Sequence, residues 1–74
     1  MESLFQTTLN YNGKATAYDV RFEQEAYIFQ PHQAAAPVMR LKREEDEWHG
    51  ATEADPSLRA AAISELDRYL LSQH

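Results

Sequence analysis

The chain has no cysteine, which excludes disulfide bonds and zinc sites built on thiolates. It has only two glycines, Gly13 and Gly50, too few for the glycine-rich loops that bind nucleotide phosphates. No apolar run approaches the roughly 18 residues of a membrane span, and residues 1–6 carry an acid where a secretory signal requires a base. These absences predict a soluble protein with no membrane contact, and the missing cysteine favours the cytoplasm.

Basic residues are also scarce, because 12 acids stand against 7 bases and give a formal net charge of −5. This charge repels phosphate backbones at long range and argues against general nucleic-acid binding. The 74 residues are predicted to form one domain, 1–74, close to the smallest size that buries a self-sufficient core. A second copy of the chain would therefore add stability.

Residue patterns that carry catalysis or bind metals are missing as well. The histidines His32, His49 and His74 have neither the helical i,i+4 nor the strand i,i+2 spacing of paired metal ligands. No Gly-x-Ser-x-Gly turn is present. The acidic run 44–47 lacks the spacing of a calcium loop and is typical of a solvated hairpin tip. We therefore expect no enzyme activity, no catalytic residues, no cofactor and no metal site.

One long helix is predicted over residues 55–73. Asp55 can cap the helix with its carboxylate, Pro56 suits the first helical position, and the alanines at 60–62 are the best helix formers. At about 100° per residue, the apolar side chains of this segment gather in an arc of roughly 140°. The arc consists of Leu58, Ala62, Ile63, Leu66, Tyr69 and Leu70. It must be buried against the rest of the chain.

A β-hairpin is predicted at the start of the chain. Asn12-Gly13 is the strongest short hairpin signal, because a type I′ turn needs positive φ at both central positions. Pairing outward from this turn puts Leu9 opposite Thr16, Thr7 opposite Tyr18 and Phe5 opposite Val20. The apolar sides of both strands then lie on the same face, so the turn and the alternation agree.

The third predicted strand, 26–30, is apolar on both faces. A two- or four-residue loop before it sends Tyr27 and Phe29 to the face of Tyr18, whereas a three-residue loop sends Ala26 and Ile28 there. We expect the aromatic residues to face inward.

The next strand is predicted over 38–43, opened by Pro37, with Met39 and Leu41 facing inward. If Glu45-Asp46 is a turn, Trp48 lies opposite Arg43 on a short fifth strand. The number of strands therefore stays at four or five.

The predicted class is α+β: an antiparallel β-meander of four or five strands over 1–50, with the C-terminal helix 55–73 packed on one face. No crossover connection is needed, so parallel pairing is not expected. The predicted core consists of Phe5, Leu9, Tyr18, Val20, Phe22, Tyr27, Phe29, Met39, Leu41, Trp48, Leu58, Ala62, Ile63, Leu66 and Leu70.

The outer face of this sheet is the predicted interaction surface. It combines aliphatic side chains with the stems of basic residues, as non-obligate interfaces do. Its residues are Leu4, Arg21, Ile28, Val38, Arg40 and Lys42. We expect a non-enzymatic protein-interaction or self-association module, with an unidentified protein partner or a homodimer formed through this face or an edge strand. Scattered surface aliphatics are also normal in proteins without such a function.

Two other functions are weighed against this one. A single-stranded nucleic-acid module would use Arg21, Arg40 and Lys42 with Lys14, but the net charge disfavours it and the aromatic residues are assigned to the core. An accessory subunit of an enzyme would need a pocket that joins Tyr18, His49 or Glu47, and no local pattern predicts one. The outline of the fold alone does not distinguish among these three functions.

Overall fold

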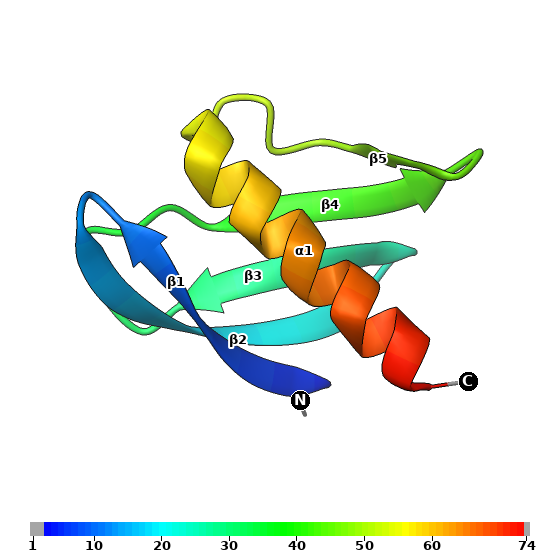
Figure 1. Ribbon diagram of the computed structural model, residues 1–74, viewed down its shortest axis with the longest axis horizontal. Coiled ribbons are helices and arrows are strands. Elements are labelled where there is room, and N and C mark those ends of the chain that lie inside the picture. Colours follow the sequence, from blue (N-terminus) through cyan, green and yellow to red (C-terminus); the bar gives the residue numbers. More distant parts are fainter. Residues whose placement is uncertain (1–2, 74) are drawn as a thin grey trace.

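A computed structural model describes residues 3–73 and, over that range, shows five antiparallel strands in one curled sheet and one C-terminal helix (Figure 1). Each strand pairs with the next one along the chain. The elements are β1 (Phe5–Tyr11), β2 (Lys14–Glu23), β3 (Ala26–Pro31), β4 (Met39–Glu44), β5 (Glu47–His49) and α1 (Pro56–Ser72). The predicted α+β meander is confirmed, with the fifth strand included.

The first hairpin has the predicted register. Phe5 pairs with Val20, Thr7 with Tyr18, and Leu9 with Thr16. Asn12 and Gly13 both have positive φ, at 52° and 79°, as a type I′ turn requires.

The other two hairpins use the same turn geometry without the same sequence signal. Gln24 and Glu25 have φ of 50° and 64°, and Glu45 and Asp46 have φ of 52° and 64°. The right-handed twist of the strands favours this turn, so the sheet imposes a conformation that these side chains do not prefer. The two-residue turn at 24–25 places Tyr27 on the inner face, which confirms the predicted orientation of β3.

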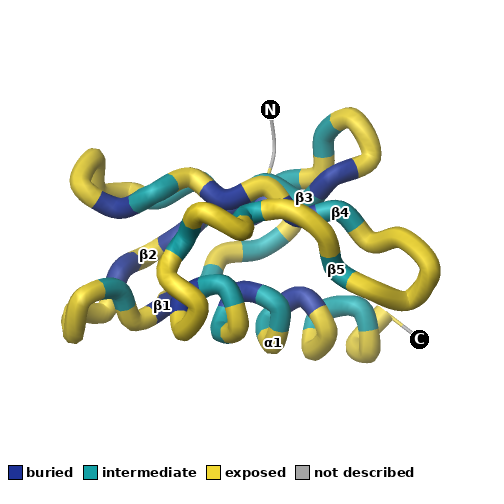
Figure 2. The backbone as a smooth tube through the Cα atoms, turned by 90° about the horizontal axis from the view of Figure 1, so that it is seen from above, coloured by how far each residue is buried: buried dark blue, intermediate teal, exposed yellow. Residues whose placement is uncertain are grey.

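The helix covers the inner face of the sheet and forms a separate layer (Figure 2). Leu58, Ala62 and Leu66 of α1 are fully buried. Facing them, the sheet contributes the buried residues Leu9, Tyr18, Val20, Phe29, Met39 and Leu41. At the start of α1, the Leu58 amide donates to the Asp55 carboxylate at 3.2 Å, so the predicted cap is present.

Five more predicted core residues lie at the margin of the core. Phe5, Tyr27, Trp48 and Ile63 are partly buried and pack against the core, and Leu70 is half-buried.

Phe22 is a wrong core prediction, because the structure leaves it 51% exposed. It lies on the inner face but next to the last residue of β2, and its ring packs against Tyr27 with a centroid distance of 4.9 Å.

Two residues on other strands also differ from a simple pattern. Val38 is predicted to be the first residue of the fourth strand, but β4 begins only at Met39. Ala26 is fully buried although its register places it on the outer face.

Candidate interaction surfaces

The structure brings three of the six predicted surface residues into one row across the sheet. Arg21 on β2 pairs with Ile28 on β3, and Ile28 pairs with Arg40 on β4. All three side chains lie on the outer face, because their neighbours in each strand face α1. The half-buried Ile28 therefore lies between two arginines on the solvent side of the central strand.

The other three predicted residues lie around this row. Leu4 precedes β1 and is 41% exposed, and Val38 precedes β4 and is 56% exposed. Lys42 is two residues beyond Arg40 on the same face of β4. The outer face thus carries an arginine-flanked centre with aliphatic groups at its margin.

The cations of this face have partners of their own. Arg21 Nε lies 3.3 Å from the Glu23 carboxylate, and Lys42 Nζ lies 3.8 Å from that of Glu44. Arg40 Nη2 donates to the Gln24 carbonyl at 3.4 Å. In both ion pairs the acid is two residues further along the same strand, so it shares the face of the base. These acids reduce the positive potential of the face.

A further contact between an acid and a base, Asp19 with His32, lies beside the row. Asp19 on β2 contacts His32, just after β3, at 3.1 Å. The hydrogen bond from His32, together with the charges of His32 and Arg21, lowers the pKa of Asp19 below its usual value and outweighs the effect of partial burial. This contact ties the segment after β3 to the middle of β2.

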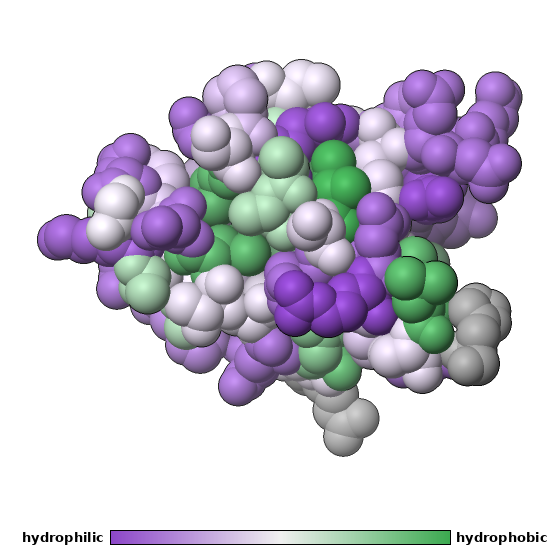
Figure 3. All heavy atoms as spheres, viewed as in Figure 1, coloured by the Kyte–Doolittle hydropathy of each residue, from purple (hydrophilic) through white to green (hydrophobic). Residues whose placement is uncertain are grey.

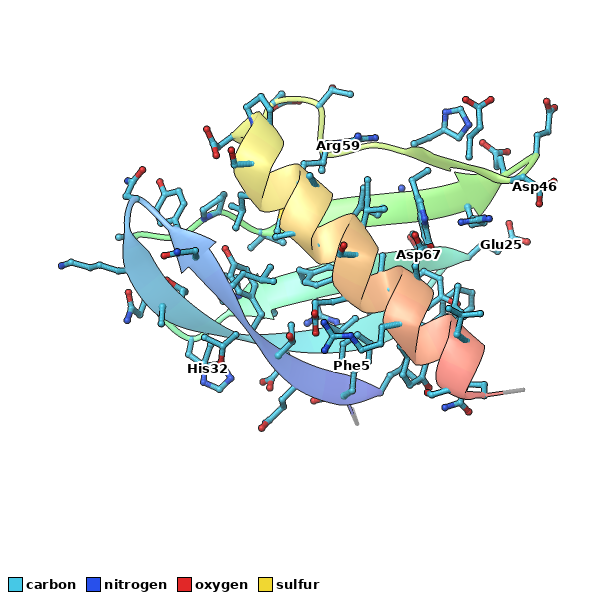
Figure 4. All side chains as sticks on the ribbon, in the orientation of Figure 1. Phe5, Glu25, His32, Asp46, Arg59 and Asp67 are labelled. Atoms are coloured by element: carbon cyan, nitrogen blue, oxygen red, sulfur yellow. The ribbon has the colours of Figure 1, made fainter. Side chains whose placement is uncertain are left out.

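A cluster of aromatic residues lies at the end of the sheet where β2 meets β3 and β4 meets β5. Phe22 packs on Tyr27, and Tyr27 meets Trp48 edge-on at 5.8 Å between centroids. Glu25 and Asp46, labelled in Figure 4, mark the two turns at this end. This cluster is not predicted from the sequence, because the sequence pattern assigns Phe22, Tyr27 and Trp48 all to the core. The available signal was that Phe22 and Tyr27 flank one two-residue turn while Trp48 follows the other.

Asp67 joins this cluster to the helix. Its Oδ1 accepts from Trp48 Nε1 at 3.1 Å and lies 3.4 Å from Arg43 Nη1. The Arg43 guanidinium also lies over the Trp48 ring, 5.1 Å from its centroid. An open hollow is lined here by Arg43, Asp46, Trp48, Asp67, Leu70 and Leu71. Figure 3 shows hydrophobic groups at the surface near the end of α1, where Leu71 is 74% exposed.

The structure does not bring together the residues that an enzyme-like pocket would need. Tyr18 is fully buried in the core, and its hydroxyl donates to the Pro37 carbonyl at 3.2 Å. His49 and Glu47 are exposed on β5. Among residues 3–73, no group of three or more histidines and acids is arranged to hold a metal ion.

In the described part of the chain, α1 is too short and too polar to cross a membrane. Comparison with known proteins finds no matching family model, no similar curated protein and no similar solved structure.

Proposed function

We propose that the protein is a non-enzymatic interaction module that binds a partner protein through the outer face of its sheet. The observation that carries this proposal is the row Arg21–Ile28–Arg40, in which an aliphatic residue on the central strand lies between two arginines. Arginine is enriched at protein interfaces, and an apolar centre with a charged rim is their usual arrangement.

The arrangement of the helix supports the same proposal. α1 covers only the inner face, and Leu4 and Val38 add exposed aliphatic area at the margin of the outer face. Because the cations alternate with acids, the face suits a partner with a mixed surface better than a strongly acidic one. The cysteine-free composition supports a role in the cytoplasm. A partner that is itself an enzyme would make this protein an accessory subunit.

Binding of single-stranded nucleic acid has less support. Stacking of bases requires aromatic side chains on the binding face, but Tyr18, Tyr27 and Phe29 lie on the inner face of the sheet. Arg21 and Lys42 are paired with acids, and Lys14 lies beside the first turn, away from the row.

Affinity capture from a cytoplasmic extract, followed by mass spectrometry, tests the proposed function. The wild-type protein is compared with Ile28→Asp, which places a charge at the centre of the row. Leu71→Asp is the matched control, because Leu71 is exposed on α1, away from the outer face. We expect the same partner with the wild type and Leu71→Asp, and its loss with Ile28→Asp, while thermal melting shows all three folded. The proposal is contradicted if Ile28→Asp still captures the partner, or if the wild-type protein captures no partner at all. A labelled single-stranded oligonucleotide that binds at low salt would favour the nucleic-acid alternative.

A further inference from the structure

The two edge strands of the sheet differ in how they are protected. β5 is only three residues long and follows the acidic turn 44–46, and short charged edges resist pairing with another strand. β1 is seven residues long, Phe-Gln-Thr-Thr-Leu-Asn-Tyr, with no charge, proline or glycine. Edge strands usually carry charged side chains, proline or a bulge against unwanted pairing. β1 thus lacks the usual protection against pairing with a further strand.

The backbone of β1 has hydrogen-bonding groups to offer on its free side. The two-residue turn makes Tyr11 and Lys14 a hydrogen-bonded pair, so every second residue of β1 from Tyr11 back to Phe5 bonds to β2. The N–H and C=O groups of Gln6, Thr8 and Asn10 therefore point away from β2. Within residues 3–73, no hydrogen bond reaches these groups.

Among residues 3–73, α1 makes no hydrogen bond to the backbone of β1. It meets β1 through side chains of the inner face: Phe5 stacks on Tyr69 at 4.6 Å between centroids, and Thr7 Oγ1 donates to Glu65 Oε1 at 2.7 Å. Figure 1 shows β1 running beside α1, and β2 is the one strand of the described sheet that neighbours β1. Gln6, Thr8 and Asn10 are exposed.

The sequence of β1 is nearly symmetric about Thr8. Phe5 and Tyr11 are aromatic and lie three residues to either side, and Gln6 and Asn10 are amides two residues to either side. If two β1 strands pair antiparallel about Thr8, aromatic residues lie opposite aromatic residues and amides lie opposite amides. Thr8 of one chain then lies opposite Thr8 of the other, and its backbone N–H and C=O groups are among those that point away from β2. Each of the three outward pairs exchanges two hydrogen bonds, so the pairing makes roughly six.

We propose that the chain forms a homodimer by antiparallel pairing of two β1 strands about a two-fold axis at Thr8. The two sheets, of five strands each, then join into one continuous sheet. No charged side chain lies on β1 itself, and the acids nearest to it, Glu65 on α1 and Asp19 on β2, belong to neighbouring elements. The pairing uses the edge of the sheet and not the row Arg21–Ile28–Arg40, so it does not depend on the proposed function.

Cysteine cross-linking tests the register, because the natural chain has no cysteine. In the proposed dimer the two residues at position 8 have Cα atoms about 5.5 Å apart, which suits a disulfide. Asn10 lies opposite Gln6, so its two copies are more than about 13 Å apart. We expect Thr8→Cys to form a disulfide-linked dimer under mild oxidation, whereas Asn10→Cys stays monomeric on a non-reducing gel. Equal cross-linking of both variants, or of neither, overturns the proposed register.

Sedimentation over a range of protein concentrations tests the dimer itself. The wild type is expected to shift towards twice the monomer mass as its concentration rises. Thr8→Lys places two like charges opposite each other at the axis and should shift the dissociation constant at least about tenfold towards monomer. Thr8→Val keeps the backbone and the charge and should dimerise like the wild type. A wild-type protein that is monomeric throughout, or a Thr8→Lys variant that dimerises equally, overturns the proposal, whatever the outcome for Ile28→Asp.

Discussion

Gly50 lies directly against the backbone carbonyl of Arg40, so that a Cβ atom at position 50 would overlap with that oxygen. Its φ of +104° is also one that residues with a side chain rarely adopt. Because the neighbour is backbone in β4, it cannot move aside without disturbing the strand. We expect Gly50→Ala to lower the free energy of unfolding by about 2 to 4 kcal/mol, as measured by urea denaturation.

Gly13→Ala is the matched control for Gly50. Gly13 has a φ of +79°, but a Cβ atom there would meet only open space. The cost should be limited to backbone strain, about 1 kcal/mol. Equal losses for the two variants would contradict the view that the contact with Arg40 dominates at Gly50.

The link between Asp67, Trp48 and Arg43 holds the fifth strand to the helix. Asp67→Ala removes the acceptor of both bonds and should destabilise the protein by about 1 kcal/mol, a modest loss because the carboxylate is partly exposed. Asp67→Asn keeps an oxygen for Trp48 Nε1 and loses only the charge opposite Arg43, so its effect should be smaller. Trp48 is the only tryptophan, and its fluorescence should shift to the red in Asp67→Ala more than in Asp67→Asn.

Much of this fold could be predicted because independent local signals agree. The Asn12-Gly13 turn and the alternation of Phe5, Leu9 and Val20 give the same register, and the structure has it. The predicted helix bounds lie within one residue of those of α1, because Asp55 and Pro56 mark its start chemically.

The exposure of Phe22 and the contact of Asp67 could not be predicted, because both depend on where the helix lies on the sheet. Phe22 has the correct face and still remains exposed, because periodicity identifies a face but not how far the covering element extends. For the same reason Asp67, which lies outside the predicted apolar arc of the helix, still accepts a hydrogen bond from Trp48. The sequence pattern places Arg21, Ile28 and Arg40 on one face of the sheet. Their alignment in one row also depends on the register of β4 on β3, and no turn signal in the connection 32–38 predicts that register.

Arg59 joins the start of α1 to the end of β5. Its Nε donates to the Gly50 carbonyl at 2.9 Å and its Nη2 to the Trp48 carbonyl at 3.0 Å. A lysine has one point charge and cannot reproduce this two-pronged contact. We expect Arg59→Lys to cost about 1 to 2 kcal/mol of stability in chemical denaturation. Arg68→Lys is the control: Arg68 makes an exposed i,i+3 ion pair with Glu65, and its change should cost no more than about 0.5 kcal/mol. Similar costs for both would contradict a special role for Arg59.

The ion pair of Asp19 and His32 predicts how stability depends on pH. The pKa of Asp19 is lower in the folded protein than in the unfolded chain, so folding is favoured when this carboxyl is ionised. Its contribution is present above about pH 4 and is lost as the pH falls through the lower folded pKa. Asp19→Asn should therefore be less stable than the wild type at neutral pH and should lose less stability on acidification, as urea midpoints at several pH values would show. Glu53→Gln removes the same charge from the exposed segment before α1 and should keep the wild-type profile. If Asp19→Asn and the wild type lost stability in parallel below pH 4, the ion pair would have no part in acid denaturation.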